Sequence, residues 1–365
     1  MSKSTIRKIA ILTGGGDCPG LNAAIRSVVQ TAILEYGIQV VGVPDGFKGL
    51  LENKFVPLDL MNTTGIFAKG GTILGSSNVD TPFSVPVVKG GEKTYEDRSD
   101  EVIEHLKRER VDAMIVVGGD GTQAMSHAMA QKGVKVVGIP KTIDNDLNGT
   151  EFTIGFFTAV ATAVDALDKL HTTAESHHRI MVVELMGRNA GWIALFAGLG
   201  GDADVILIPE IDYQLDKVAA FLNDLHHTRK RYSIVVVAEG AKPLGGDVTV
   251  SKVIEDSPEK IRLGGIGQRV AHDLEKLTGR ETRAITLGHL LRGGPPEGFD
   301  RILASRFGVA AVKAVVEGKY DTMVAYRNDN VELVPLETGA GKNRFISTDS
   351  PFLLAARKRG INFGD

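Results

Sequence analysis

Three short segments of this 365-residue chain combine glycine with polar side chains in ways that suit phosphate chemistry. Thr13–Asn22 (TGGGDCPGLN) and Gly118–Thr122 (GGDGT) offer bare backbone N–H groups, which can face an anion at the start of a helix. Asp120 suits Mg²⁺, because this ion binds through one or two carboxylates plus substrate phosphates. Pro140–Asp146 (PKTIDND) places a cation, a hydroxyl and two carboxylates in one loop. These residue types predict phosphoryl transfer, with one carboxylate accepting a hydroxyl proton and Lys141 facing the phosphate.

Each segment also has a simpler interpretation. A glycine-rich turn between a strand and a helix occurs in many α/β proteins, and the first segment matches neither GxGxxG nor the P-loop pattern. The second segment could be a capped turn, and the third a solvated turn rich in Asn and Asp. Their succession along one chain favours phosphate binding over three unrelated turns.

The elements that must position these segments are short, almost continuously apolar runs separated by helical patterns. Such runs are typical of strands buried on both faces, and hence of a parallel sheet covered by helices. The apolar runs are Lys8–Thr13, Gln39–Val43, Ala113–Val117, Val134–Ile139, Ile180–Glu184, Asp204–Ile208, Ser233–Ala238 and Arg283–Leu287. The helical patterns are Leu21–Glu35, Asp100–Glu109, Thr158–Ala174, Leu215–Leu225, Gly265–Leu277 and Ile302–Glu317. We expect a doubly wound α/β fold; a TIM barrel is the alternative, but the sharpest motifs follow only a few strands.

The composition argues against several classes of protein. The chain has 42 Lys plus Arg and 45 Asp plus Glu, so its formal charge of −3 does not favour nucleic acid as a partner. No run approaches the roughly 20 apolar residues of a membrane span. A single Cys cannot form an internal disulfide, and we expect a cytoplasmic protein. Glycine, at 43 residues, is in excess, which in a chain that is 43% hydrophobic indicates tight turns and not disorder.

The three segments, in this order, resemble the 6-phosphofructokinase family. Motifs similar to that family continue in the second half of the chain, at Ile154–Thr158, Glu184–Arg188, Ala238–Gly240, Glu281–Arg283 and Gly288–Gly294. The resemblance runs from about Lys8 to about Lys319. It implies transfer of a phosphoryl group to the 1-hydroxyl of fructose 6-phosphate, a glycolytic reaction, with Mg²⁺ as cofactor.

The resemblance also implies the catalytic roles. Asp144 is expected to be the general base toward the sugar hydroxyl, framed by Thr142 and Asp146. Asp120 is expected to hold Mg²⁺, and Arg188 to stabilise charge on the transferring phosphoryl group. The donor would be bound by Gly15, Gly16, Gly119, Asp120, Gly121, Thr122 and Lys141.

The sugar phosphate has its own expected set. Arg179, Arg283, His289 and Arg292 would gather the 6-phosphate, and Glu239 would bind sugar hydroxyls. The set is completed by Thr142, Asp144, Met186, Gly187 and Arg188. In the family, the residues matching Arg179 and Arg283 reach in from a neighbouring subunit. We therefore expect a homotetramer or homodimer with shared active sites.

Two positions bear on whether the donor is ATP or pyrophosphate. In the family, a carboxylate in place of Gly121 fills the space of the ATP α-phosphate, so glycine favours ATP. Many ATP users have glycine in place of Lys141, whereas pyrophosphate users have lysine. We give Gly121 more weight, because a steric and charge block is harder to evade than an extra cation. One departure concerns the segment after Ser76, where many members carry a phosphate-contacting Arg but this chain has Ser77-Asn78-Val79.

The lobes implied by the resemblance divide the chain by role. Residues 1–155 plus about 291–325 are expected to form the donor-binding lobe, and residues 156–290 the sugar-phosphate lobe. Residues 326–365 are left without a placement, except for a hairpin expected at Met323–Arg327 and Asn330–Pro335 around an Asn328–Asp329 turn.

Four other functions compete with ATP-dependent phosphofructokinase. A pyrophosphate-dependent phosphofructokinase is the nearest. An NAD or lipid kinase also carries GGDGT, but Pro140–Asp146 and Gly288–Gly294 argue against it. A catalytically silent sugar-phosphate-binding subunit would be expected to lose Asp144 or Arg188, and both are present. A pure binding module is disfavoured for the same reason.

Overall fold

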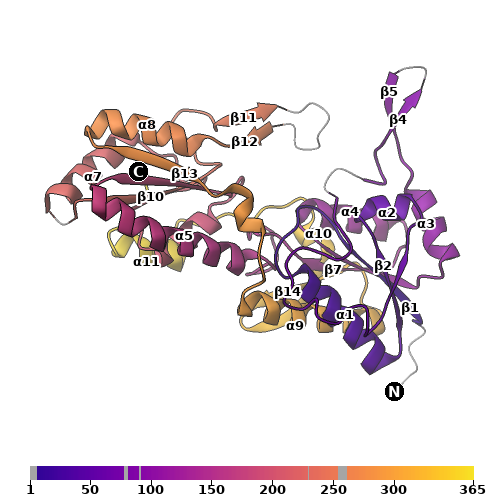
Figure 1. Cartoon of the computed structure of the whole chain (residues 1–365). Helices are drawn as coiled ribbons and strands as arrows, with labels where there is room; N and C mark the ends of the chain where they lie inside the picture. The colour runs from indigo at the N-terminus through magenta and orange to yellow at the C-terminus, as the bar shows by residue number, and fades with distance from the viewer. Residues whose placement is uncertain (1–5, 78–80, 90–91, 229, 254–260) are drawn as a thin grey trace. The chain divides into compact units, whose positions relative to one another are not determined.

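A computed structural model describes residues 6–77, 81–89, 92–228, 230–253 and 261–365 of the chain. These residues form two compact units (Figure 1). Unit 1 contains residues up to Thr142, then Leu147–Gly155 and Arg292–Asn343. Unit 2 contains Ile143–Asp146, Phe156–Leu291 and Arg344–Asp365.

Unit 1 is built on a seven-stranded sheet with the order β15-β14-β7-β6-β1-β2-β3. Its strands are β1 (Lys8–Thr13), β2 (Gln39–Val43), β3 (Val56–Leu58), β6 (Ala113–Gly118), β7 (Val136–Pro140), β14 (Thr322–Arg327) and β15 (Asn330–Pro335). The five central strands are parallel, and the two edge strands are antiparallel to their neighbours. Every residue of β6 is buried, as expected for a strand covered on both faces.

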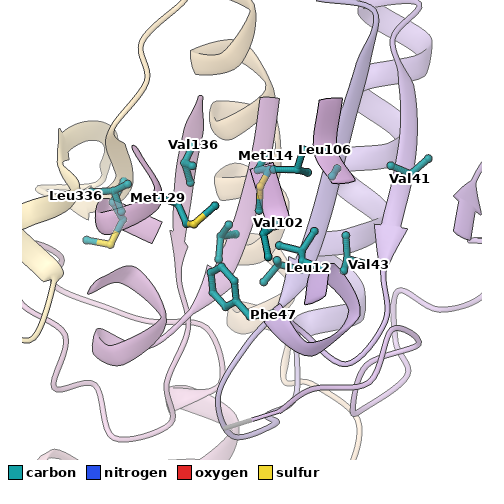
Figure 2. Packing of buried hydrophobic residues seen from close by; sticks show 14 of the residues in the cluster. Leu12, Val41, Val43, Phe47, Val102, Leu106, Met114, Met129, Val136 and Leu336 are labelled. Atoms are coloured by element: carbon teal, nitrogen blue, oxygen red, sulfur yellow. The ribbon is translucent and has the colours of Figure 1, made fainter. Parts of the chain in front are cut away.

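Helices cover both faces of this sheet. They are α1 (Leu21–Tyr36), α2 (Phe47–Leu51), α3 (Ser99–Arg108), α4 (Asp120–Gln131), α9 (Gly298–Val316) and α10 (Leu336–Gly339). One hydrophobic cluster joins Leu12 and Met114 of the sheet to Phe47 of α2, Val102 of α3 and Met129 of α4 (Figure 2). Helices α1 and α9 pack against each other, and they contact β2, β7 and β14 of the sheet. Unit 1 also carries the short hairpin β4 (Val85–Lys89) and β5 (Glu92–Glu96).

Unit 2 has a four-stranded, fully parallel sheet with the order β13-β8-β10-β9. Its strands are β8 (Ile180–Leu185), β9 (Val205–Leu207), β10 (Ser233–Ala238) and β13 (Thr282–Thr286), and a separate hairpin pairs β11 (Val250–Val253) with β12 (Ile261–Leu263). The helices are α5 (Phe156–His177), α6 (Trp192–Gly200), α7 (Leu215–Thr228), α8 (Ile266–Thr278) and α11 (Pro351–Lys358), with a 3₁₀ helix η1 at Gly288–Arg292. Helices α7 and α8 share a hydrophobic cluster with the sheet, and α5 lies on the other side of it (Figure 1).

The expected doubly wound α/β fold with largely parallel sheets is confirmed. Both sheets are open, with edge strands at each end, so the TIM-barrel alternative is wrong. All eight apolar runs form strands, within about two residues of the expected bounds. Five helices of the described residues were missed, namely α2, α4, α6, α10 and α11. Three of them, α2, α10 and α11, are short. Helix α6 is apolar on all sides and therefore lacks an amphipathic period, and α4 follows the glycine loop directly and presents mainly small or polar residues.

The C-terminal region, which the sequence left unplaced, is divided between the units. The expected hairpin forms as β14 and β15, and its turn residues Asn328 and Asp329 both have positive φ, as a two-residue turn of this kind requires. β14 pairs with β7 and so extends the sheet of unit 1. From Arg344 onward the chain belongs to unit 2, together with the four residues Ile143–Asp146, which the sequence had placed in the donor lobe. Among the described residues, no helix combines the length and apolarity needed to cross a membrane.

Candidate active site

The first glycine loop of unit 1 connects β1 to α1 and is packed against the second. The N–H of Gly14 donates to the carbonyl of Val117 at 2.9 Å, and the N–H of Gly15 donates to the carbonyl of Ser77 at 2.9 Å. A Cβ on Gly14 would lie 2.8 Å from Thr122 Cγ2, so no larger residue fits without movement. Gly15 has a φ of +77°, which also favours glycine. The Gly15 N–H already donates to Ser77. The expectation that Gly15 contacts the phosphoryl donor therefore rests on its lack of a side chain.

The second glycine loop ends β6 and begins α4. Asp120 is the first residue of the helix, and the first intrahelical bond joins Gln123 N–H to the Gly119 carbonyl at 2.9 Å. The N–H groups of residues 120–122 precede that bond, so they lie at the positive end of the helix, where anions bind. A Cβ on Gly121 would meet nothing within 4 Å. The space beside Gly121 is therefore open to a ligand, whereas Gly118 is closed, with its Cβ position 2.3 Å from Thr122 Cβ.

Two cations lie against these loops. Lys141 is buried at 3% exposure, and its ammonium donates to the Gly16 carbonyl, while its N–H donates to the Gly118 carbonyl at 3.1 Å. Arg292 donates to the carbonyl of Asp17 at 3.2 Å. The structure thus places Arg292, which we had expected at the sugar phosphate, on the first glycine loop of unit 1. Both cations therefore contact the first glycine loop, which follows the carboxyl end of β1.

Asp120 fits the expected magnesium ligand in type and place. It is half-buried at the start of α4, next to the glycines whose backbone would face donor phosphates. The described residues contain no group of three or more His, Cys, Asp and Glu side chains able to hold a metal. A single carboxylate suits Mg²⁺, which is usually held by one or two carboxylates, water and substrate phosphates.

The expected base loop, Ile143–Asp146, belongs to unit 2. Asn145 in its centre has a φ of +52°, a left-handed conformation that Asn tolerates better than most residues. Asn145 and Asp146 are buried, at 1% and 8% exposure, and Asp144 is half-buried. Thr142, which precedes the loop, is in unit 1, where its carbonyl accepts a hydrogen bond from Thr153 at 2.6 Å. The two acidic side chains therefore flank a single buried, left-handed residue.

Further expected residues lie at the carboxyl ends of β8 and β10. Glu239 N–H donates to the Leu185 carbonyl at 2.9 Å, and Gly240 N–H donates to the Gly187 carbonyl at 3.1 Å. These bonds place Glu239 beside the Met186-Gly187-Arg188 turn. Gly187 has a φ of +140°, and a Cβ on Gly240 would lie 2.0 Å from the Arg188 carbonyl, so both glycines are required by the turn. The Arg188 guanidinium donates to the Ile261 carbonyl at 2.7 Å.

Arg179 and Arg283 lie at the amino ends of β8 and β13. Arg179 directly precedes β8, and Arg283 is the second residue of β13, paired with Met181. Five residue steps along β8 from Ile180 to Leu185 correspond to roughly 17 Å. Within unit 2, the two arginines are therefore well separated from Arg188 and Glu239. His289, which follows β13 in η1, is exposed and lies after the carboxyl end of that strand.

Glu281, which the sequence analysis did not single out, joins the two arginines. Its Oε1 lies 2.9 Å from Arg179 Nη2 and 2.5 Å from Arg283 Nη2. The hydrogen bond from Arg179 and the charges of Arg179 and Arg283 hold the pKa of Glu281 below its usual value. The Glu281-Thr282-Arg283 motif contains this residue, but nothing in the motif indicates that Glu281 pairs with both arginines. Gln123 was also missed; it donates to the carbonyls of Gly118 and Ile139, at 3.0 and 3.1 Å, and joins the ends of β6 and β7.

The remaining expectations from the sequence concern Cys18 and the segment after Ser76. Cys18 is buried and its thiol donates to the Ile154 carbonyl at 3.4 Å, and burial raises its pKa to about 12. The nucleophilic form of cysteine is the thiolate, so a thiol with this raised pKa is a poor nucleophile. Asn78 and Val79, where the chain lacks the arginine found in many family members, lie outside the described residues.

Comparisons with known proteins agree on one family. The family model described as phosphofructokinase matches residues 8–315. ATP-dependent 6-phosphofructokinase 2 of Clostridium perfringens is 50% identical, over 99% of this chain and 99% of its own. Pyrophosphate–fructose 6-phosphate 1-phosphotransferase of Streptomyces coelicolor is 45% identical, over 98% of this chain and all of its own.

A solved structure of similar fold is the pyrophosphate-dependent phosphofructokinase of Marinobacter aquaeolei, with a TM-score of 0.79 over 99% of this chain and 93% of that one. At 20% identity, that likeness concerns the fold alone. The match to the family model and the identity to curated relatives over nearly the whole length lead to one conclusion: the chain belongs to the phosphofructokinase family.

Proposed function

We propose that this protein transfers the γ-phosphoryl group of ATP to the 1-hydroxyl of fructose 6-phosphate, giving fructose 1,6-bisphosphate and ADP in glycolysis. The observation that carries the proposal is the edge of unit 1 formed by the two glycine loops, Asp120 and Lys141. A loop with two carboxylates follows it directly in the chain. Phosphoryl transfer depends mainly on positioning and charge neutralisation, and these residues provide both.

In the proposed mechanism, Asp144 accepts the proton of the 1-hydroxyl as that oxygen attacks the γ-phosphorus. Asp146 and Thr142 orient the hydroxyl and the base. Arg188 donates hydrogen bonds to the phosphoryl oxygens as charge develops on them, which a planar guanidinium does well. Asp120 would hold Mg²⁺, and the ion would neutralise the donor phosphates.

The donor is proposed to be ATP because of the space beside Gly121. With no atom within 4 Å of its Cβ position, nothing in the fold requires glycine there, and a bulky donor has room. Lys141 is the feature shared with pyrophosphate users. Its ammonium binds the Gly16 carbonyl, so it also has a structural task between the two glycine loops. Pyrophosphate as donor is the second candidate, favoured by this lysine.

We further propose a homodimer or homotetramer with shared sites. Arg179 and Arg283 lie at the ends of β8 and β13 that are remote from Arg188, so they cannot join that arginine on one sugar phosphate within unit 2. A second copy of the chain would supply them instead. Size-exclusion chromatography with light scattering tests this directly, and a monomer that is fully active would contradict it.

A catalytically silent subunit remains a more distant alternative, but Asp144 and Arg188 are both retained. The charge balance and the single Cys support a cytoplasmic place for the enzyme, without nucleic acid or membrane as partners.

The proposal is tested by one coupled spectrophotometric assay with fructose 6-phosphate and Mg²⁺, in which ATP and pyrophosphate are offered in parallel. We expect turnover with ATP. The variant Gly121→Asp should fold normally and lose most of its ATP-dependent rate, because its carboxylate would repel the donor phosphates and occupy their space. Strong turnover of the wild type with pyrophosphate and none with ATP would overturn the choice of donor.

A further inference from the structure

Arg344 lies beyond residues 8–315, which the family model matches, yet it contacts the proposed base loop. Its Nη2 and Nε donate to the carbonyl of Asn145 at 3.0 and 3.3 Å. Its backbone N–H donates to the carbonyl of Asp146 at 2.6 Å. One residue therefore binds the carbonyls of both residues that follow Asp144, and all of these residues belong to unit 2.

Arg344 is itself held by Trp192, the first residue of α6. The guanidinium carbon lies 4.2 Å from the centre of the Trp192 ring, and Trp192 Nε1 donates to the Arg344 carbonyl at 3.0 Å. Two residues later, Ile346 N–H donates to Glu210 at 2.9 Å, and the same carboxylate accepts the N–H of Gly191 at 3.1 Å. The buried start of α6 thus fixes the arginine, and the arginine contacts the loop.

The geometry of the loop explains why such a contact matters. Asn145 is in a left-handed conformation between the two acidic residues, so the orientation of its peptide groups determines where both side chains point. A general base must lie within hydrogen-bonding distance of the proton it accepts. A displacement of about 1 Å can lower the rate about 100-fold.

We propose that Arg344 is a positioning residue that fixes the Asp144–Asp146 loop in its catalytic conformation. The inference rests on the proposed function, in which Asp144 is the base. It assigns a role in catalysis to the C-terminal segment, although Arg344 need not touch the substrate. The planar guanidinium is required because it binds the Asn145 carbonyl with two nitrogens while its face stacks on Trp192.

A purely structural tether is the competing explanation, and the chain provides a matched control. Arg359 also lies in the C-terminal segment and donates to a distant carbonyl, that of Leu199, at 2.9 Å, and to Asp202 at 2.5 Å. It fastens the same segment to the other end of α6 but does not contact the base loop. If tethering alone mattered, losing either arginine would have a similar effect on the rate.

The experiment compares Arg344→Met, Arg344→Lys and Arg359→Met in the full-length enzyme. We expect Arg344→Met to lower kcat about 10- to 100-fold with an unchanged KM for ATP. Arg344→Lys should be no better, because an ammonium group cannot form the planar arrangement. Arg359→Met should keep the wild-type kcat. Trp192 is the only tryptophan, so its emission should shift to longer wavelength in the Arg344 variants alone as the ring gains water.

The kcat values of Asp144→Ser and of the Asp144→Ser/Arg344→Met double variant distinguish the role of Arg344 from the proposed function itself. If Arg344 acts through the base, adding Arg344→Met to Asp144→Ser should lower kcat little further. An additive loss, a wild-type kcat in Arg344→Met, or an equal loss in Arg359→Met would overturn the inference. If Arg344→Met does not fold by circular dichroism, Arg344→Lys decides, and wild-type kcat in that variant is the contrary result. Full activity of Asp144→Ser would instead contradict the proposed function itself.

Discussion

The glycine loops of unit 1 and the arginines of unit 2 are both expected to bind phosphate, but they are built differently. In the loops, bare backbone is fixed by close packing, with Cβ positions on Gly14 and Gly118 only 2.8 and 2.3 Å from Thr122 side-chain atoms. In unit 2, Arg179 and Arg283 are 26% and 54% exposed and share the single carboxylate of Glu281. Changes in the loops should therefore affect stability, whereas changes in the arginines should affect binding.

This difference follows from what each group must do. Backbone N–H groups at a helix start bind phosphate only if the chain is held rigidly, and the interlocked glycines and Gln123 hold it. Exposed arginines can move to their ligand, and exposed ion pairs contribute little to stability. Glu281 holds both arginines within ion-pair distance of one carboxylate.

The largest expected effect is on chemistry and not on either binding region. Asp144→Ser removes the proposed base, so kcat should fall by about 10²–10⁴-fold, the usual contribution of general base catalysis. Binding of ATP should change little. Steady-state kinetics measure both values, with the exposed Asp165→Ser as a control that keeps the wild-type kcat.

The second effect concerns the arginines. Arg283→Ala should raise the KM for fructose 6-phosphate about 10- to 100-fold, because a hydrogen bond to a charged group contributes about 1.5–3 kcal/mol. Its thermal midpoint should match the wild type. Glu281→Gln weakens the competing partner, so its KM should be no higher than that of the wild type. A large loss of stability in Arg283→Ala would contradict the view that the arginines affect binding and not stability.

The third effect concerns stability within the second glycine loop. Gly118→Ala forces a methyl group against Thr122 and should lower the free energy of unfolding by about 1–3 kcal/mol, as overpacking does. Gly121→Ala, three residues along, meets open space and gains helix propensity, so stability should hold or rise. Denaturant unfolding of both variants measures the difference. Equal losses would show that the two positions are packed alike.

The smallest effect concerns Cys18, which lies in the first glycine loop. Because burial raises its pKa to about 12, the thiol should not react with a disulfide reagent at pH 8 in the folded protein, and should react after denaturation. Cys18→Ser should keep full activity. Rapid labelling of the native protein would indicate that this loop opens.

Much of this architecture could be predicted from the sequence, because buried parallel strands leave a strong local pattern. Runs such as Lys8–Thr13 and Ser233–Ala238 form strands with the expected bounds. The glycine loops were found because phosphate binding requires glycine at positions where the backbone must approach closely.

What could not be predicted depends on contacts between distant residues. Arg344 binds the carbonyl of a residue 199 positions away, and nothing near it in the sequence marks it as special. Arg292 was expected with the sugar phosphate because of its neighbours in the motif, and its additional contact with the first glycine loop of unit 1 was not foreseen. The separation of Arg179 from Arg188 likewise became apparent only from the register of β8 and β13.

The central claim, transfer from ATP to the sugar, is tested most directly by following the phosphoryl group itself. The wild-type enzyme is incubated with Mg²⁺, fructose 6-phosphate and ATP radiolabelled in its γ-phosphate, and the sugar phosphates are then separated. The account predicts label in fructose 1,6-bisphosphate, on the 1-phosphate, with one ADP formed for each. A sugar fraction without label, in an enzyme that forms the same product from unlabelled pyrophosphate, would contradict it.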